Sequence, residues 1–320
     1  MPLSFDLPFA DLLTYQGVNP RPADFDAYWE TALAEMRALD PQIERIPADF
    51  QTDFAYCEHL YFTGVGGARV HAKLLTPRHQ TEPGPALLMF HGYANYSGDW
   101  VDKLPYVAQG ITVAALDCRG QGGLSEDVGG VKGWTLFGHI VRGLADAPEK
   151  LLYRAHFLDT AQLARIVMAM PQVDASRVGA TGASQGGGLT LACAALEPRI
   201  KQIAPVFPFL SDYRRVWDLD LDVDAYAELR DWFRHFDPMH QREEEVFTRL
   251  GYIDVQHLAG RIRAKTQFYV GLMDTICPPS TQFAAYNKIP ATKALMVYPD
   301  FAHEDFPGRR DKIFQFMLAL

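Results

Sequence analysis

Several features that mark other classes of protein are absent from this sequence. No two of its four cysteines are spaced as Cys-x-x-Cys, so neither a redox pair nor a zinc element is expected. No apolar run approaches the roughly 20 residues that span a bilayer, and the N-terminal segment lacks the positive start of a secretory signal. We therefore expect reduced cysteines and a cytoplasmic protein.

Positive charge is also scarce. The 320 residues hold 30 Lys and Arg against 39 Asp and Glu, a formal net charge of −9, and no Lys/Arg-rich run is present. A field of this sign repels phosphate backbones and anionic lipid, so we expect neither nucleic acid nor a membrane as a partner. The 48% hydrophobic content is sufficient for a large core. The sequence contains no internal repeat or low-complexity tract.

Short unbroken apolar runs, each followed by a Gly-rich or polar turn, dominate the chain after Pro85. Buried parallel strands have this pattern. The runs are 87–90, 113–116, 178–181, 203–206, 268–270 and 295–298. Helical segments separate several of them, the clearest having Leu163, Ile166, Val167 and Met170 on one face. The alternation predicts an α/β fold with a mostly parallel central sheet, helices on both faces, and reactive groups at the carboxyl ends of strands.

An N-terminal helical arm is expected over about residues 1–50. Phe25, Trp29, Leu33 and Met36 recur at spacings of four, four and three residues. This spacing gives an amphipathic helix whose apolar face must pack on another part of the protein.

A helical insertion is expected over about residues 211–263, between two predicted strands. We interpret it as a cap over the site or as an oligomer surface. Earlier in the chain, residues 55–75 have β character interrupted by the glycine-rich stretch 64–67, which indicates a hairpin. The length permits two domains, but large α/β enzymes often form one, and we predict a single domain over 1–320.

The predicted strand 178–181 leads into Gly-Ala-Ser-Gln-Gly, residues 182–186, and then into a helical segment. Gly-x-Ser-x-Gly between a strand and a helix is the nucleophile elbow, in which small residues let the chain turn tightly enough to project the serine Oγ. The alternative interpretation is a tight structural turn. We predict that Ser184 is a nucleophile.

Serine is a weak nucleophile and needs a base, which in α/β-hydrolases follows it in the chain. Four histidines follow Ser184: His235, His240, His257 and His303. The first three fall in the predicted insertion, whereas His303 stands five residues past the last predicted strand. We therefore predict that His303 is the base.

The base in turn needs an orienting carboxylate from a strand end between the serine and the histidine. Asp274 stands four residues past Val270 and fits this position. Asp254 and Asp300 are the alternatives, but Asp300 lies only three residues before His303, where reaching the far imidazole nitrogen is hard. Asp274 is the predicted acid.

A tetrahedral intermediate also requires hydrogen-bond donors for its oxyanion. Gln185, directly after the nucleophile, supplies one backbone N–H at a helix N-terminus. The second is expected from the turn His91-Gly92 after the strand 87–90, and the N–H of Tyr93 is the candidate. His91 itself is interpreted as structural, because it precedes the nucleophile.

Arg119 opens the sequence Arg-Gly-Gln-Gly after the predicted strand 113–116. We interpret this arginine as a group that pins loops through hydrogen bonds to a carboxylate or carbonyls, and not as a catalytic residue.

Three short motifs in this chain resemble the signature motifs of one enzyme family. They are Arg-Gly-Gln at 119–121, Gly-Ala-Ser-Gln-Gly at 182–186 and His-Glu at 303–304, with supporting stretches at 21–29, 159–162 and 208–215. The sequence is similar over nearly its whole length to carbohydrate esterase family seven, the acetyl xylan esterases also known as cephalosporin C deacetylases.

The resemblance implies an α/β-hydrolase fold in which Ser184, Asp274 and His303 form a catalytic triad and Tyr93 and Gln185 supply the oxyanion hole. It also implies hydrolysis of acetyl esters of short xylo-oligosaccharides and of cephalosporin C, with a strong preference for small acyl groups. A doughnut-like homohexamer with inward-facing sites is implied as well. No metal or cofactor is expected.

Three other classes of protein fit the sequence less well. A peptidase of the prolyl oligopeptidase type shares the elbow and the order of the triad, but its propeller has no room in 320 residues. A non-catalytic protein on this fold would lack a triad member. A metal-dependent deacetylase would need clustered His and Asp ligands at suitable spacing. Within the family resemblance, Leu136-Phe137 marks a segment where fine substrate preference can differ.

Overall fold

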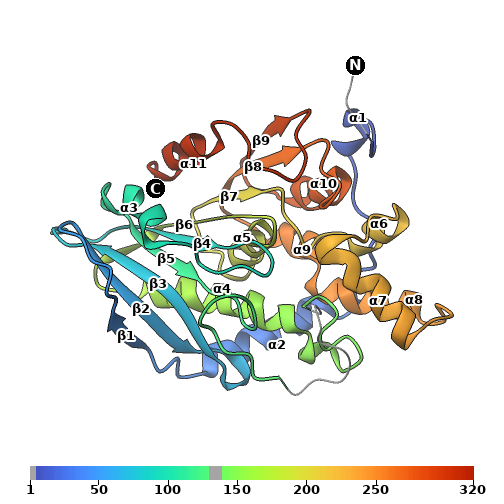
Figure 1. The fold of residues 1–320 in the computed structure, drawn as a ribbon, viewed down its shortest axis with the longest axis horizontal. Coiled ribbons are helices and arrows are strands. Elements are labelled where there is room, and N and C mark those ends of the chain that lie inside the picture. The colour runs from blue at the N-terminus through green and yellow to red at the C-terminus, as the bar shows by residue number, and fades with distance from the viewer. Residues whose placement is uncertain (1–4, 130–138) are drawn as a thin grey trace.

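The computed structural model describes residues 5–129 and 139–320. The first four residues of the predicted arm, and Leu136 and Phe137, lie outside these ranges. A single sheet runs through the described part of the chain, with the strand order β1-β2-β3-β5-β4-β6-β7-β8-β9 (Figure 1). The strands are β1 (Glu44–Pro47), β2 (Ala55–Thr63), β3 (Arg69–Pro77), β4 (Gly84–Phe90), β5 (Thr112–Leu116), β6 (Val173–Ala183), β7 (Gln202–Val206), β8 (Lys265–Gly271) and β9 (Lys293–Tyr298).

The sheet is mostly parallel, as predicted. The five pairings that connect β5, β4, β6, β7, β8 and β9 are parallel. The three that connect β1, β2, β3 and β5 are antiparallel. Strands β2 and β3 form the predicted hairpin, and the turn between them contains Gly66 and Gly67 at φ of 73° and 83°, a left-handed backbone that glycine adopts without steric cost. Each of the six predicted apolar runs lies inside a strand.

Helices cover both faces of the sheet (Figure 1). Outside the insertion they are α1 (Phe9–Leu12), α2 (Phe25–Ala38), α3 (Leu104–Val107), α4 (Leu152–Met168), α5 (Gln185–Leu196), α10 (Pro279–Lys288) and α11 (Arg309–Met317), with 3-10 turns η1 (Val65–Gly67), η2 (Trp100–Lys103) and η3 (Pro148–Lys150). Side chains alternate along the strands, so in β4 Ala86 and Leu88 join the core under α4 and α5 while Leu87 joins the core under α11. Two apolar layers therefore enclose the strands.

The arm helix α2 packs on the main core. The four residues of its predicted apolar face are at most 4% exposed. The indole ring of Trp29 stacks on Phe157 of α4, with ring centroids 5.9 Å apart, and its Nε1 donates to the carbonyl oxygen of Tyr252 at 3.0 Å. The prediction that this face packs on another part of the protein is confirmed.

The insertion lies between β7 and β8 and is helical, as predicted. Its elements are α6 (Tyr213–Asp218), η4 (Asp224–Tyr226), α7 (Ala227–Phe236), α8 (Glu243–Leu250), η5 (Gly251–Ile253), α9 (Val255–Leu258) and η6 (Ala259–Arg261). Its aromatic residues Tyr226, Phe233 and Phe247 are buried in the same core as α4 and α5. None of the helices in the described residues has both the length and the apolar character needed to cross a bilayer.

Candidate active site

Ser184 occupies a sharp turn between β6 and α5. Its backbone has φ 57° and ψ −119°, a conformation that costs a non-glycine residue of order 1–3 kcal/mol. Three backbone hydrogen bonds hold it there. The Ser184 N–H donates to the carbonyl of Val206 at 3.0 Å, and the Ser184 carbonyl accepts from the N–H groups of Gly188 at 3.1 Å and Phe209 at 3.0 Å. The strained turn is therefore tied to α5 and to the segment after β7.

The two glycines of the elbow are required by close backbone contacts. A Cβ added to Gly186 would lie 2.1 Å from the carbonyl oxygen of Phe90. A Cβ added to Gly182 would lie 2.5 Å from that oxygen and from the carbonyl oxygen of Gly186. These distances are shorter than any real Cβ contact, so the chain can turn here only with glycine on both sides of the serine.

The structure brings the three predicted triad residues together. Nε2 of His303 lies 3.0 Å from the Oγ of Ser184, and Nδ1 of His303 lies 2.8 Å from Oδ2 of Asp274. The pattern of these bonds assigns the proton of the neutral ring to Nδ1, which leaves Nε2 free to accept the hydroxyl proton of Ser184. Asp274 is fully buried, whereas one fifth of the His303 side chain is exposed.

Three further donors orient the carboxylate of Asp274. Its Oδ1 accepts from the backbone N–H groups of Ile276 at 3.0 Å and Cys277 at 2.8 Å. Its Oδ2 accepts from Nε2 of Gln282 on α10 at 3.2 Å. Both oxygens are therefore held in the plane that presents Oδ2 to His303.

The alternative acids lie elsewhere. Asp254 begins α9, accepts from the backbone N–H of Asp212 at 3.0 Å, and is fully buried, which raises its pKa to about 6. Asp300 is exposed in the turn before His303. Within the described residues, the carboxylate hydrogen-bonded to His303 is that of Asp274.

The other three histidines after the serine lie in the insertion, as predicted. His257 is packed against the ring of Phe25 at 5.8 Å, and burial lowers its pKa to about 4. The ring of His240 is stacked on the ring of Phe233, with centroids 4.7 Å apart. His235 lies in the last turn of α7.

Two backbone N–H groups are the predicted oxyanion donors. Gln185 is the first residue of α5, where N–H groups have no partner inside the helix and the helix dipole favours negative charge. Tyr93 belongs to the loop after β4, and that loop lies beside the elbow: a Cβ on Gly92 would be 4.0 Å from the carbonyl oxygen of Ala183. The two residues therefore flank Ser184, and their role in binding an oxyanion stays a prediction.

His91 has a structural role, as interpreted from the sequence. Its Nε2 accepts from the backbone N–H of Cys118 at 3.0 Å, and its Nδ1 lies 2.7 Å from the carbonyl oxygen of Gly92. Burial lowers its pKa, so the ring is neutral. Its Nε2 joins the loop after β4 to the loop after β5, and its Nδ1 contact stays within the loop after β4.

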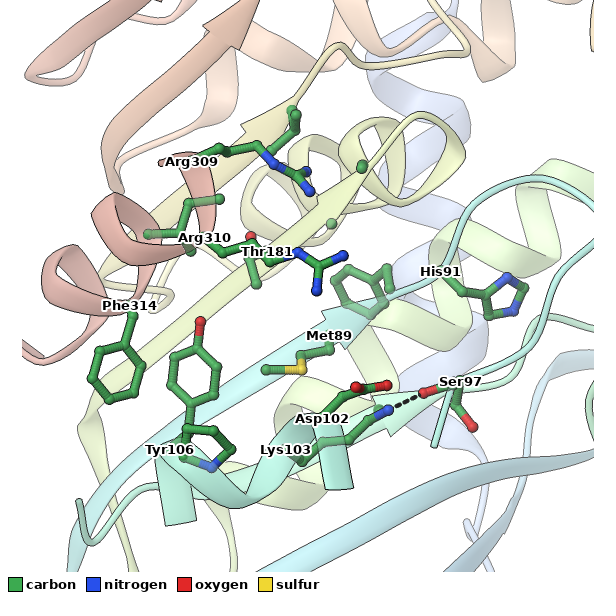
Figure 2. A pocket seen from close by; sticks show the side chains of 18 of the residues that line it. Met89, His91, Ser97, Asp102, Lys103, Tyr106, Thr181, Arg309, Arg310 and Phe314 are labelled. Carbon is green, nitrogen blue, oxygen red and sulfur yellow. Dashed lines mark hydrogen bonds between the residues drawn. The ribbon is translucent and has the colours of Figure 1, made fainter. Parts of the chain in front are cut away.

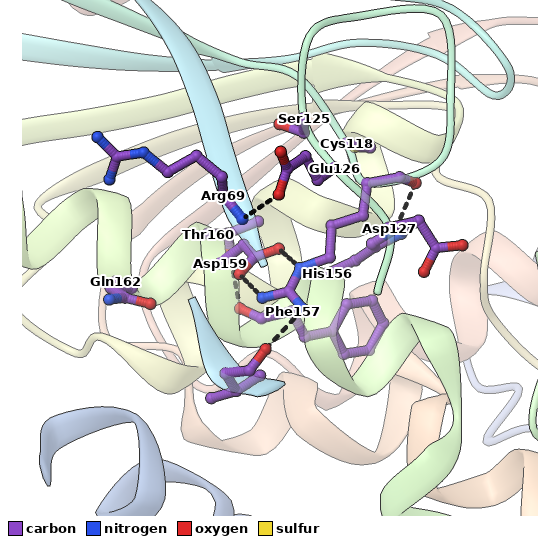
Figure 3. A network of polar contacts seen from close by, with 12 residues as sticks. Arg69, Cys118, Ser125, Glu126, Asp127, His156, Phe157, Asp159, Thr160 and Gln162 are labelled. Carbon is purple, nitrogen blue, oxygen red and sulfur yellow. Dashed lines mark hydrogen bonds and ion pairs between the residues drawn. The ribbon is translucent and has the colours of Figure 1, made fainter. Parts of the chain in front are cut away.

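The interpretation of Arg119 as a loop-pinning residue is also confirmed. Its Nε and Nη2 donate to the two oxygens of Asp159 on α4 at 2.6 and 2.7 Å, and its Nη1 donates to the carbonyl of Val65 at 2.7 Å. The Arg119 carbonyl lies 3.1 Å from Nε2 of His156. Figure 3 shows Asp159 and His156 side by side on α4 in this network. The network holds the end of β5 against α4.

A buried polar network lies behind the nucleophile. The side-chain oxygen of Gln185 accepts from the hydroxyl of Tyr153 at 2.6 Å and from Nε2 of Gln121 at 2.7 Å. Gln121 is the third residue of the Arg-Gly-Gln motif, which is the signal that marked this segment. No pattern in the sequence indicated Tyr153, because its partner lies 32 residues away on another helix.

One group of possible metal ligands occurs in the described residues. Ligand atoms of Asp274, Cys277 and His303 lie within 4.8 Å of one another. Hydrogen bonds to one another already occupy Asp274 and His303. Burial raises the pKa of the Cys277 thiol well above its usual value, so this cysteine is a protonated thiol and not a thiolate ligand. The group fits a proton relay better than a metal centre.

A cavity of about 790 Å³ opens on the face of the sheet between α3 and α11. Met89 and Thr181 lie on its floor, and Tyr106, Arg309 and Arg310 lie around it (Figure 2). Ser184 and His303 do not line it, so it is separate from the hydroxyl and imidazole described above.

Comparison with known proteins gives consistent matches over most or all of the chain. A family model described as Acetyl xylan esterase (AXE1) matches residues 1–320. The crystal structure of acetyl xylan esterase 1 from Thermoanaerobacterium sp. JW/SL YS485 is 60% identical, with a TM-score of 0.97, and the match covers 98% of this chain and 99% of that one. The acetyl xylan esterase from Paenibacillus sp. R4 is 34% identical, with a TM-score of 0.93 and the same coverage.

A curated relative is the acetyl esterase Axe7A of Xylanibacter ruminicola, which is 27% identical over 293 residues. The match covers 88% of this chain but spans only 63% of that protein's length. The fold predicted from the sequence, an α/β-hydrolase with helices on both faces of a mostly parallel sheet, is confirmed by the two solved structures. Because the family model covers its entire length, the chain belongs to the acetyl xylan esterase (AXE1) family, whose members are carboxylic ester hydrolases.

Proposed function

We propose that this protein is a serine esterase that removes acetyl groups from short acetylated xylo-oligosaccharides and from cephalosporin C. The proposal assigns the chemistry to a Ser-His-Asp acyl-enzyme mechanism. The observation that carries it is the hydrogen-bonded series from the Ser184 Oγ through His303 to Asp274, at a nucleophile elbow, in a chain of the acetyl xylan esterase family.

In the first step, Nε2 of His303 takes the proton of the Ser184 hydroxyl while Oγ attacks the acetyl carbonyl carbon. The carbonyl π electrons move to oxygen, and the N–H groups of Gln185 and Tyr93 donate to the resulting oxyanion. Asp274 accepts from Nδ1–H of His303 throughout, which stabilises the imidazolium and keeps the ring in the productive tautomer.

The tetrahedral intermediate then collapses. Nε2–H of His303 protonates the departing sugar oxygen, the bond between that oxygen and the acetyl carbon breaks, and an acetyl ester of Ser184 remains. Water repeats the sequence on this ester: His303 accepts a proton from the water, the hydroxyl adds to the carbonyl, and acetate leaves as the Ser184 oxygen regains its proton.

The test is replacement of the nucleophile in an assay of acetate release. We expect Ser184→Ala to lower kcat for 4-nitrophenyl acetate, acetylated xylo-oligosaccharides and cephalosporin C by about 10⁴-fold or more. Ser176→Ala is the matched control, because Ser176 is exposed on the surface and bonds only locally to Asp174. A folded Ser184→Ala protein with near-native rates would refute the assignment.

Two further measurements separate this proposal from the other classes. A fluorophosphonate is expected to label Ser184 in the wild type and not in Ser184→Ala, and a non-catalytic protein would take up no label. Acetyl esters are expected to be cleaved much faster than butyrate esters or aminoacyl amides, whereas a peptidase would reverse the second preference. Activity that vanished after treatment with a chelator would indicate a metal-dependent deacetylase.

The proposal extends to the organisation of the protein. We propose one α/β-hydrolase domain over 1–320, with an arm at about 1–50 and an insertion at about 211–263; its support is the core that α2 and the insertion share with α4. A homohexamer with inward-facing sites follows from the family resemblance, and light scattering tests it. A cytoplasmic location is supported by four buried cysteines that are all free, and cell fractionation tests it.

A further inference from the structure

A buried carboxyl group of the insertion contacts the loop that carries the predicted oxyanion donor. Glu228 lies in the first turn of α7 and is 4% exposed. Its Oε1 accepts from the hydroxyl of Tyr93 at 3.1 Å and from the backbone N–H of Ile140 at 3.0 Å. One oxygen atom therefore joins the insertion, the loop after β4 and the backbone at Ile140.

The ring of Tyr93 lies between this carboxyl group and the nucleophile elbow. It makes edge contacts with Phe209, at 5.7 Å between centroids, and with His139, at 5.1 Å. Phe209 is itself tied to the elbow, because its N–H donates to the carbonyl of Ser184 at 3.0 Å. The edge contacts restrain the plane of the ring, and the bond from the hydroxyl to Glu228 ties the far end of the ring to the insertion.

Placing a carboxyl group here costs free energy. Among the described residues no arginine or lysine forms an ion pair with Glu228, and burial raises its pKa to about 8. The group is therefore mostly neutral at pH 7. Neutrality suits its position, since a charged carboxylate beside the oxyanion loop would oppose the negative charge that develops on the substrate oxygen. An apolar residue would fill the same space without the desolvation cost, which points to a role for the oxygen atom itself.

We propose that Glu228 is a positioning residue for the oxyanion hole: by holding the hydroxyl of Tyr93, it fixes the backbone N–H of Tyr93 where the oxyanion forms. This inference rests on the function proposed above. It gives the insertion a part in the reaction, beyond covering the site or meeting another subunit. Because the side chain and the N–H belong to one residue in a loop, a shift of the ring moves the donor, and a misplacement of about 1 Å can cost roughly 100-fold in rate.

The test uses three single variants and one control. Glu228→Leu removes the acceptor, and Tyr93→Phe removes only the hydroxyl. We expect each to lower kcat for 4-nitrophenyl acetate by about 10- to 100-fold, with KM changed less than about threefold, because the lost interaction acts in the transition state. Glu228→Gln keeps an acceptor oxygen in place and is expected to recover most of the lost kcat. Glu244→Leu, at an exposed position of α8, is expected to match the wild type.

Two readouts distinguish positioning from a merely structural role. A boronic acid that forms a tetrahedral adduct on Ser184 is expected to bind Glu228→Leu more weakly, by about the factor lost in kcat. The double variant Tyr93→Phe with Glu228→Leu is expected to lose less kcat than the product of the two single losses, because both substitutions remove the shared bond between the Tyr93 hydroxyl and Glu228. Thermal unfolding of each variant, measured alongside, shows that the comparison is made on folded protein.

The inference is overturned if Glu228→Leu and Tyr93→Phe keep the wild-type kcat, if Glu228→Gln loses as much as Glu228→Leu, or if boronic acid binding is unchanged. Should Glu228→Leu fail to fold, Tyr93→Phe with the same two readouts decides the question. A wild type that hydrolyses no acetyl ester would instead overturn the proposed function, and this inference with it. An active wild type with fully active variants overturns the inference alone.

Discussion

Replacing Arg119 alone is expected to lower the free energy of unfolding by several kcal/mol. Replacing Asp159 in the same protein is expected to restore most of that lost stability. Both side chains are 2% exposed, and they share a bidentate pair with N···O distances of 2.6 and 2.7 Å. Arg119→Met leaves the Asp159 carboxylate without a cation, and it also leaves the carbonyl of Val65 without its donor. Breaking a buried pair in this way costs about 3–5 kcal/mol of unfolding free energy.

The pairwise nature of this cost can be measured. In the double variant Arg119→Met with Asp159→Leu neither charge of this pair remains, so we expect an unfolding free energy within about 1–2 kcal/mol of the wild type. Arg119→Lys keeps a charge but cannot form the two-pronged contact, and we expect an intermediate loss. Arg310→Met, which removes a side chain that is 80% exposed, is the control and is expected to change stability by less than about 0.5 kcal/mol.

The loss in Arg119→Met also depends on pH. Burial raises the pKa of Asp159 even with Arg119 present, and removal of the cation raises it further. A carboxyl whose pKa is higher in the folded than in the unfolded state loses stability as pH rises above its unfolded value, near 4. The deficit of Arg119→Met is therefore expected to be smaller at pH 5 than at pH 8.

Urea unfolding followed by circular dichroism at the two pH values measures all of these quantities. The reasoning is refuted if Arg119→Met costs less than about 1 kcal/mol, or if the double variant loses the sum of the two single losses. It is also refuted if the deficit grows as the pH falls.

Three more changes test other parts of the structure. Gly186→Ala would place a methyl group 2.1 Å from a carbonyl oxygen of β4, so we expect a lower melting temperature and at least a tenfold lower kcat. Gly260→Ala is the control, because a methyl group there meets no atom within 4 Å, and it is expected to change neither quantity. Burial raises the pKa of Asp254 to about 6, so the wild type loses stability as the pH rises from about 4 to 6. Asp254→Asn lacks this ionisation, and urea unfolding is expected to show its stability rising relative to that of the wild type over the same pH range. Trp29→Ala is expected to cost about 3–5 kcal/mol in the same assay, and a cost under about 1 kcal/mol would show that the arm is not part of the core.

The strands and the hydrogen-bonded series Ser184–His303–Asp274 could be predicted because their sequence signals are local. A strand that is buried on both faces needs an unbroken apolar run, and such runs appear in β4 to β8. The elbow needs two glycines at fixed spacing around Ser184, and the acid and base must follow it at later strand ends. Asp274 and His303 could therefore be identified because each stands a few residues past the end of an apolar run.

Other features had no local signal. Strand β1, Glu44 to Pro47, is exposed at all four positions, so no alternation marks it, and it lies inside the range assigned to the arm. The contact between Tyr93 and Glu228 joins residues 135 positions apart, and although the His91-Gly92 turn marked Tyr93, no motif marked Glu228 as its partner. Contacts of this kind depend on how the insertion folds back onto the β4 loop, which hydrophobic periodicity does not describe.

Several non-glycine residues with a left-handed backbone lie at the nucleophile and in the segment that follows β7. Ser184 has a positive φ, and so do Phe207, at 30°, Leu210, at 71°, and Asp212, at 53°, in the segment that leaves β7. Each such residue costs of order 1 kcal/mol or more, and it persists only where the surroundings enforce it.

The segment after β7 supports both halves of the site at once. The Phe207 ring packs against the imidazole of His303, with centroids 4.5 Å apart, and its N–H is held by a backbone carbonyl of β8 at 2.8 Å. Two residues later, Phe209 contacts the ring of Tyr93 and donates to the carbonyl of Ser184. The sheet order places β7 between β6 and β8, and the segment that follows it contacts the base through Phe207 and the ring of Tyr93 through Phe209. Phe207 and Phe209, on either side of Pro208, therefore pack against two groups that must keep a fixed distance from the same serine.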